Sequence, residues 1–332
     1  MVADARREGG GAAGLAPWQL AVRRLRRNRA VLGFGALLAV LVVLALAAPL
    51  WAHVAGTGGP SRNHLADTIV VDGERRDVVS EDRIPIGPTW RAEYFLGADG
   101  NGRDVAVRLL YGARNSLLIG IGATLLSLLL GVTLGLLAGY LRGWVDALIS
   151  RSLDAVWAFP VLLLALALGV SLSAEGFALG PLHIAGDSKW IPTLIIAVVS
   201  AVYLARPIRG LVLSLREQQF VEAARAQGAG PLRIMVSELL PNLASTILVF
   251  VPLLVANAIL LEGALSFLGA GVKSPEASWG TMLSDGIALL TSAPHLTIVP
   301  GVMLVLTVLA LNVLGDGLRQ ALDPRAQIRL EH

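Results

Sequence analysis

Runs of about twenty apolar residues dominate this sequence and limit what it can fold into. Six of them are predicted to cross a membrane, at residues 31–52, 115–138, 152–174, 191–213, 242–264 and 295–315. A helix rises about 1.5 Å per residue, so about twenty residues span the roughly 30 Å of bilayer hydrocarbon. The composition agrees, because 55% of the 332 residues are hydrophobic and 15% are charged. We therefore expect an all-α membrane protein with six transmembrane helices.

Arginine residues predict how the spans are oriented. A basic cluster precedes the first span and consists of Arg23, Arg24, Arg26, Arg27 and Arg29. By the positive-inside rule this cluster keeps the N-terminal segment, residues 1–30, in the cytoplasm, and six spans return the tail, residues 319–332, to the same side. A cleaved secretory signal is disfavoured, because the first run is long for a signal and five spans follow it. We expect a multi-pass protein of the cytoplasmic membrane with both termini inside.

The sequence divides into a first span, a long loop and a core. Span 31–52 leads into residues 53–114, which are expected outside the cytoplasm, and a five-span core follows at residues 115–318. Between His53 and Asp104 nine Asp and Glu outnumber six Arg, and long loops follow the positive-inside rule only weakly. The role of this loop stays open between contact with a substrate-delivery protein and a tolerated surface insertion.

Several classes of function lack the residues they need. The chain has no Cys, which excludes disulfides and thiolate metal sites. Its only Lys residues, Lys189 and Lys273, lie outside any P-loop, so the chain cannot be its own ATPase. The five His residues form no HExxH pair, and no Gly-x-Ser-x-Gly elbow occurs. No catalytic site, cofactor or metal is expected, and no nucleic acid partner, since the Arg residues are not interleaved with aromatic residues.

An ion-driven secondary transporter is the main competing class. Such proteins usually hold ionisable groups near the middle of the bilayer. Here Asp154 lies near a predicted cytoplasmic end of a span and Glu262 near an outer end, so neither marks a central relay. We expect both to form interfacial pairs, which makes the ion-driven alternative the weaker one.

Residues 206–241, between the fourth and fifth spans, are the most informative part of the sequence. Residues 222–227 are strong helix formers, Gly228 suits the left-handed end of a helix, and Pro231 suits the first turn of the next. The pattern predicts a short helix, a bend and a second short helix, after which Pro241 begins the fifth span. One face of the second helix is expected to pack through Leu232, Met235, Val236, Leu239 and Leu240.

This loop resembles the EAA motif of permease subunits of ATP-binding-cassette importers. The matching residues are Glu222, Ala223, Ala224, Gly228, Leu240 and Pro241. The family pattern has Ile ahead of the Leu-Pro pair, where this sequence has Glu238. The resemblance implies a MetI-like core with an extra N-terminal span and a cytoplasmic coupling helix. It also implies a homologous second permease, two ATP-binding-cassette ATPase subunits that hydrolyse ATP, an extracytoplasmic substrate-binding protein, and membrane lipid around the spans.

Further segments resemble the peptide and nickel permease family from about Leu96 onward. They are residues 96–99 with 102–104, 109–114, 154 with 158–160, 262–269 with 278–280, and 314–319 with 323–325. Ala98 departs from the family, which usually has Thr there. The resemblance implies di- or oligopeptides as the substrate, with nickel or another small solute as the alternative.

Polar residues in or beside the spans are candidates for lining a translocation path. They are Asn115, Ser116, Ser200, Tyr203, Asn257 and Asn312. Hydrogen bonding between helices is an equally good interpretation of each. Glycines of the second span lie four residues apart, at Gly131, Gly135 and Gly139, and share one helix face. This ridge predicts a close contact with another helix.

Overall fold

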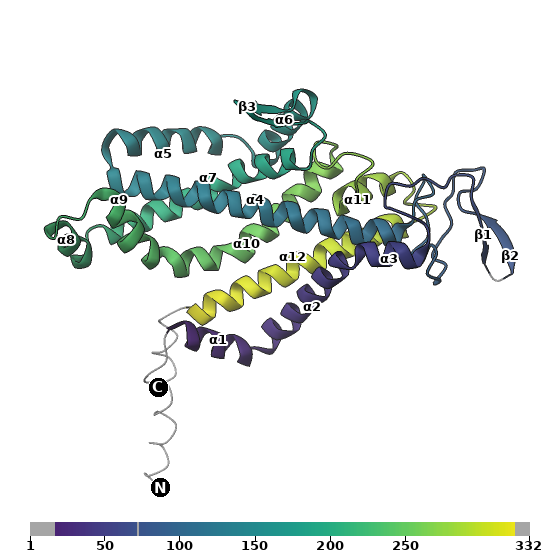
Figure 1. Cartoon of the computed structure of the whole chain (residues 1–332), viewed down its shortest axis with the longest axis horizontal. Coiled ribbons are helices and arrows are strands. Elements are labelled where there is room, and N and C mark those ends of the chain that lie inside the picture. Colours follow the sequence, from purple (N-terminus) through teal and green to yellow (C-terminus); the bar gives the residue numbers. More distant parts are fainter. Residues whose placement is uncertain (1–16, 72, 323–332) are drawn as a thin grey trace, which may run out of the picture.

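Five long helices form the body of the computed structural model, which describes residues 17–71 and 73–322 (Figure 1). They are α2 (Arg29–Leu46), α4 (Val105–Leu141), α7 (Trp190–Leu215), α10 (Leu240–Phe267) and α12 (His295–Leu322). All five are long and apolar enough to cross a membrane, and the number of spans is six when one bent pair of helices is counted as a single broken span. The predicted all-α membrane fold is confirmed. The outer parts of the predicted terminal segments, residues 1–16 and 323–332, lie outside the described residues, and with them the family-like residues 323–325.

The first span is a helix with a break near one end. α2 ends at Leu46, and α3 (Ala48–Ala55) continues it to Gly56, whose φ of 71° ends the helix in the left-handed region. At the other end, the side chain of Asn28 caps α2 by accepting bonds from the N–H groups of Ala30 and Val31. A helix that was not expected from the sequence, α1 (Pro17–Arg27), precedes this cap.

The third predicted span, residues 152–174, is not one straight helix. It is divided between α5 (Gly143–Trp157) and α6 (Val161–Glu175), which meet at 90°. The break falls at Pro160, which has no N–H to donate and disfavours helical backbone at Phe159 before it. The prediction of a continuous helix over 152–174 is wrong for this reason.

The predicted glycine ridge of the second span is confirmed, and its partner is α7. A Cβ atom added to Gly135 would lie 2.7 Å from Ile208 Cγ2, and one added to Gly139 would lie 2.7 Å from Val212 Cβ. Gly131 meets the α7 backbone in the same way, at 2.9 Å. The two helices therefore approach closely only because these positions carry no side chain. α4 itself begins at residue 105, ten residues before the predicted start, and is 37 residues long.

The loop between α3 and α4 forms a small folded unit at one end of the molecule (Figure 1). Strand β1 (Thr68–Val71) pairs antiparallel with β2 (Glu74–Asp77). Val78 and Tyr94 pack with the buried side of β1 in a small apolar core. The sequence predicted a loop outside the cytoplasm here, and its small apolar core was not predicted. A second hairpin, β3 (Phe177–Leu179) and β4 (Leu182–Ile184), lies between α6 and α7.

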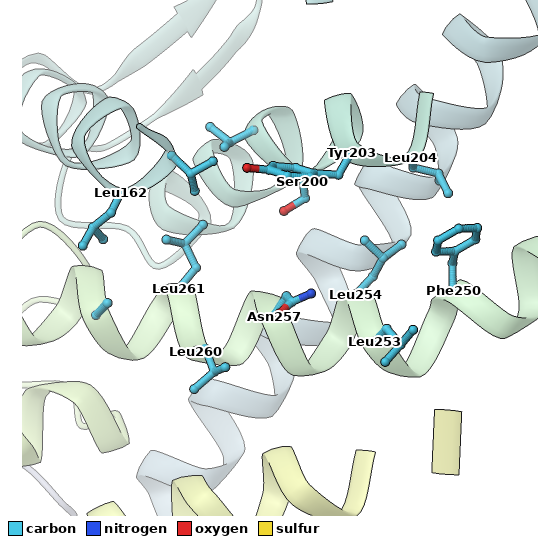
Figure 2. Close-up of a pocket in the computed structure, with 13 residues that line it drawn as sticks. Leu162, Ser200, Tyr203, Leu204, Phe250, Leu253, Leu254, Asn257, Leu260 and Leu261 are labelled. Carbon is cyan, nitrogen blue, oxygen red and sulfur yellow. The ribbon is translucent and has the colours of Figure 1, made fainter. Parts of the chain in front are cut away.

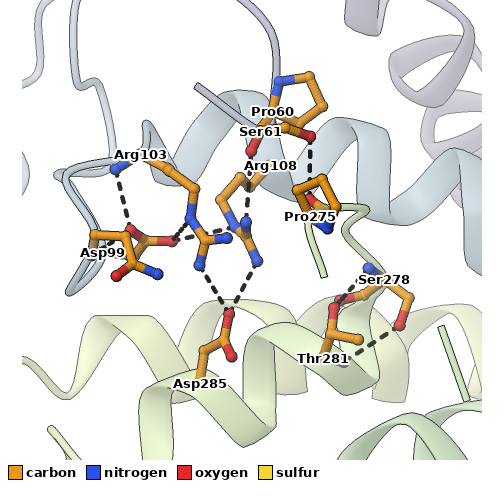
Figure 3. A network of polar contacts seen from close by, with 10 residues as sticks. Pro60, Ser61, Asp99, Arg103, Arg108, Pro275, Ser278, Thr281 and Asp285 are labelled. Carbon is orange, nitrogen blue, oxygen red and sulfur yellow. Dashed lines mark hydrogen bonds and ion pairs between the residues drawn. The ribbon is translucent and has the colours of Figure 1, made fainter. Parts of the chain in front are cut away.

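Buried ion pairs hold this unit to the bundle (Figure 3). Arg103 Nε lies 2.7 Å from Asp99 Oδ2, and Arg103 Nη2 lies 3.0 Å from Asp285 Oδ2. Arg108 Nη2 reaches the same Asp285 oxygen at 3.0 Å. Asp285 belongs to α11 (Trp279–Ile287), a short helix that was not predicted. Because Arg103 and Arg108 are only 4% and 2% exposed, the two carboxylates offset the desolvation of two guanidinium groups and tie α11 to the start of α4.

Candidate coupling segment and translocation cavity

The segment between α7 and α10 lies at one end of the bundle. α7 continues to Leu215, and the helix that leads into α10 begins at Pro231. The part of the predicted 206–241 loop outside these two helices is residues 216–230. It contains α8 (Gln219–Ala226). Figure 1 shows α8 at the end of the molecule opposite the β1–β2 hairpin, where α1 and the last turns of α12 also lie. The EAA-like residues and the basic helix therefore share one side.

Gly228 ends α8 in the manner predicted for it. Its φ is +80°, in the left-handed region. The N–H of Gly228 donates to Arg225 O at 2.9 Å, and the N–H of Ala229 donates to Ala224 O at 3.0 Å. This pair of bonds is a Schellman motif, which satisfies the last carbonyls of the helix and turns the chain sharply. A Cβ atom at this position would meet nothing within 4 Å, so the demand for glycine comes from the backbone angle alone.

One side of α8 is attached to the bundle and the other is free. Val221 is fully buried in an apolar cluster with residues of α4 and α7. The guanidinium carbon of Arg225 lies 5.6 Å from the ring centre of Tyr140, near the end of α4. Glu222 and Ala223, the first residues of the EAA-like trio, are exposed on the other side. α8 is therefore fixed in place while it presents these two residues outward.

The second short helix predicted for this loop is not separate. α9 (Pro231–Arg233) runs through a π-helical stretch, Ile234–Leu239, directly into α10. Pro241 therefore lies within a continuous helix, whereas the sequence predicted it at the start of the fifth span. A proline in that position removes one backbone bond and crowds the preceding turn. The wider π turn just before it, in which the Leu240 N–H donates to Met235 O, accommodates the proline.

The apolar face predicted for this stretch is only partly covered. Met235 and Leu239 are buried in the cluster that also holds Val221. Leu232 and Val236 are 72% and 52% exposed, so only part of the face that was expected to pack does so within this chain. They line an open apolar groove of about 480 Å³ against α4. The periodicity was real, but half of the apolar arc faces away from this chain.

A larger cavity, of about 610 Å³, opens between α6, α7 and α10. Its walls are mostly apolar, with Leu162 from α6 and Phe250 from α10 among them. Three of the predicted path residues line it: Ser200 and Tyr203 from α7, and Asn257 from α10. Figure 2 shows these polar side chains at the gap between the two helices. An apolar cavity with a few polar groups can hold a small organic ligand and orient it.

The other three predicted path residues lie elsewhere. Asn115 Nδ2 donates to Ala277 O at 2.8 Å, and Ser116 Oγ donates to Glu262 Oε2 at 2.8 Å. Both side chains are buried in contacts between α4 and segments far along the chain. These bonds favour the alternative of helix-to-helix bonding for Asn115 and Ser116. Asn312 is half-buried on α12, away from the residues that line the cavity.

The two carboxylates expected to form interfacial pairs have different environments. Asp154 fits the expectation, because its Oδ1 lies 2.5 Å from Arg206 Nη2 on an exposed side of the molecule. Glu262 does not, because its side chain is fully buried and accepts hydrogen bonds from the hydroxyls of Ser116 and Ser266. The short helix α11, whose Trp279 is also fully buried, covers this part of α10.

An aromatic and cationic chain of contacts leads from the bend at Pro160 to the cavity. The Arg206 guanidinium lies 4.3 Å from the centre of the Trp157 ring, and Trp157 contacts Tyr203 at 4.5 Å between ring centres. Sequence reasoning singled out Tyr203 but missed Trp157 and Arg206 as its neighbours. No sequence signal points to them, because the contact depends on the 90° turn between α5 and α6.

The chain matches two family models. Residues 131–328 match the model described as the binding-protein-dependent transport system inner membrane component. Residues 16–65 match the N-terminal transmembrane domain of oligopeptide transport permease C. The second match accounts for the extra N-terminal span.

Relatives and a solved structure agree with these matches. The dipeptide transport system permease protein DppC of Alkalihalophilus pseudofirmus is 36% identical over 94% of this chain and 91% of its own length. The glutathione transport system permease protein GsiD of Escherichia coli is 35% identical over 93% of this chain and 91% of its own. A chain of the inward-facing MetNI methionine ABC transporter aligns over 65% of this chain and 96% of its own, with a TM-score of 0.51 and 17% identity, which shows the fold alone. This chain therefore belongs to the family of binding-protein-dependent transport system inner membrane components, the permease subunits of ATP-binding-cassette importers.

Proposed function

We propose that this permease carries di- or oligopeptides. The observation that carries the proposal is the identity of about 35% over more than nine-tenths of the chain with relatives named for dipeptide and glutathione transport. Both of those ligands contain a peptide backbone. The cavity beside Ser200, Tyr203 and Asn257 is consistent with such a ligand, because its apolar walls suit varied side chains while hydroxyl and amide groups can bond a peptide unit. Nickel or another small solute is the alternative.

The partners in this proposal are those of the importer family. A homologous second permease completes the path, two ATP-binding-cassette subunits hydrolyse ATP, and an extracytoplasmic binding protein delivers the peptide. α8 is the coupling helix, and the end of the bundle that carries α8 and α1 faces the cytoplasm. Three features support this assignment: the exposure of Glu222 and Ala223, the fixed end of α8 at Gly228, and the Arg-rich helix on the same side.

The substrate is tested with the complete importer in vesicles, supplied with its binding protein and with ATP on the ATPase side. We expect ATP-dependent uptake of labelled di- and tripeptides that persists when a protonophore is added. Uptake of nickel without peptide would overturn the peptide assignment. Collapse of peptide uptake by the protonophore at constant ATP would instead favour the ion-driven class.

Coupling is tested by a charge reversal on α8 and a matched reversal far from it. We expect the Glu222→Arg complex to assemble normally but to hydrolyse ATP without the matching uptake of peptide. Glu81→Arg makes the same change on an exposed loop residue at the opposite end and should leave the ratio of peptide imported to ATP hydrolysed unchanged. Equal ratios in both variants would refute the role of α8.

A further inference from the structure

The basic helix α1 is held at a fixed corner of the bundle. Arg24 Nη1 donates to Ala321 O at 3.3 Å, which attaches α1 to the end of α12. The start of α2 packs just as closely on α12, since a Cβ atom on Gly317 would collide with Val31. Asn28 caps α2 between these two contacts and so separates the two helices (Figure 1). The position of α1 beside the first span is therefore determined by the fold.

The other arginines of this corner are exposed and uncompensated. They are Arg23, Arg26, Arg27 and Arg29. Within residues 17–71 and 73–322, no carboxylate pairs with any of the four. The sequence itself has no Asp or Glu between Glu8 and Asp67. The described part of the chain therefore offers these four arginines no carboxylate partner.

Some of the other arginines that the positive-inside rule assigns to the same side are neutralised. Arg209 forms two bonds to Asp146, at 2.6 and 2.7 Å, and Arg142 Nη2 lies 2.8 Å from Glu217 Oε1. A basic residue needed only to orient a span could be paired in this way. Others are also exposed and have no ion pair among the described residues, but they are spread along the chain, at Arg151, Arg233 and Arg319. The four arginines at α1 lie within seven consecutive positions, and this concentration of charge indicates a ligand outside the chain.

The faces of α1 indicate what that ligand is. Arg23 and Arg27 are four residues apart and share one side of the helix, whereas Val22 and Leu25 lie together on another, with Val22 40% exposed. A short helix with one basic and one apolar side lies in the plane of a membrane surface. α2 enters the bilayer directly after it, which places the four arginines at the height of lipid phosphates. We propose that α1 binds the headgroups of anionic phospholipids in the leaflet that α2 enters.

Guanidinium groups suit this ligand, because they bond phosphate oxygens in pairs and stay charged at any physiological pH. In a cluster of four or more basic residues next to a span, each residue raises the affinity for anionic lipid about fivefold. An acidic surface on a partner protein is a different occupant, and the test separates it from lipid. The proposal does not depend on which solute the importer carries.

The experiment uses the absence of Cys from the chain. Val22→Cys gives this chain one site for a fluorophore, on α1, and any cysteines of the partner subunits are replaced first. The complete importer is then reconstituted in phosphatidylcholine that contains phosphatidylglycerol as the anionic lipid. Spin-labelled phosphatidylglycerol or spin-labelled phosphatidylcholine then quenches the fluorophore. We expect preferential quenching by phosphatidylglycerol that weakens as salt is raised, because the interaction is electrostatic.

Variants of the labelled importer assign the preference to α1. Arg23→Gln with Arg27→Gln should lower it at least fivefold, and Lys at both positions should restore most of it. Arg75→Gln with Arg76→Gln removes the same charge from the exposed strand β2 and should change nothing. Equal quenching by both lipids in the unaltered importer would overturn the proposal. So would a preference that survives the Gln pair, or one that vanishes when the ATPase subunits are removed, which would indicate a protein partner.

Discussion

Gly228 and Gly230 lie two residues apart in the same loop, but only the backbone conformation at Gly228 requires glycine. Gly228 has a φ of +80°, where an L-residue is strained, whereas Gly230 has a φ of −72°, which any residue adopts. Neither Cβ position meets an atom within 4 Å. Gly228→Ala and Gly230→Ala therefore add the same atom to open space and differ only in backbone strain.

The size of the difference follows from that strain. A non-glycine residue in the left-handed region costs about 1–2 kcal/mol, because its Cβ approaches the backbone. Alanine also restricts the unfolded chain by about 0.4–1 kcal/mol, which favours the folded loop wherever the native angles suit it. We expect Gly228→Ala to destabilise the end of α8 by about 1 kcal/mol, a factor of about five in the opening equilibrium, and Gly230→Ala to be neutral or slightly stabilising.

Hydrogen exchange of the purified importer measures this directly. The reporter is the Ala229 N–H, which donates to Ala224 O only while the Schellman motif is closed. We expect its exchange to speed up about fivefold in Gly228→Ala and not in Gly230→Ala, and peptide uptake per ATP to fall only in the first variant. Equal exchange in the two variants would refute the assignment of the motif to the backbone angle of Gly228. Faster exchange with unchanged coupling would refute the importance of a fixed α8.

Three further changes test how the bundle is held together, each by thermal unfolding of the purified complex. Gly135→Ala should destabilise the contact of α4 with α7 by about 1–3 kcal/mol, because the new atom overlaps α7, whereas Gly33→Ala, which meets open space on α2, should not. Glu262→Leu should cost about 1–3 kcal/mol by leaving buried serine hydroxyls without their acceptor, and an unchanged midpoint would mean that these hydroxyls find other partners. Asp285→Asn should cost about 2 kcal/mol, less than a fully buried pair because its side chain is 48% exposed, and a stable variant would show that Arg108 is compensated by other groups.

The features that the sequence predicted best are those set by local chemistry. Span length follows from bilayer thickness, so four of the six predicted spans lie wholly within α4, α7, α10 and α12, although α4 begins ten residues before its predicted start. The ridge of Gly131, Gly135 and Gly139 follows from helical periodicity, and the role of Gly228 from the one backbone region that glycine alone enters freely. Each of these features is determined by a few residues that are close together in the sequence, which is why it could be predicted.

The features that were missed depend on contacts between distant segments. Leu232 and Val236 lie on a correct apolar arc, but periodicity cannot say whether such an arc faces this chain, lipid or another subunit. Glu262 was placed at an interface because α11, which covers it, is too short and mixed in composition to stand out. The bend at Pro160 had a local signal, and the error there was to weigh the apolar run above the proline.

The connectivity around α8 shows how a movement there would reach the cavity. Tyr203 lies about twelve residues, roughly 18 Å, before the end of α7, and Asn257 lies about 26 residues, roughly 39 Å, beyond Pro231. α8 is thus inserted between the two helices that carry the polar groups of the cavity. α7 packs closely on α4 at the glycine ridge, whereas α10 directly follows a π turn, where the regular pattern of backbone hydrogen bonds is interrupted. A push on α8 should therefore bend the α10 side more than the α7 side, and so change the separation of Asn257 from Tyr203.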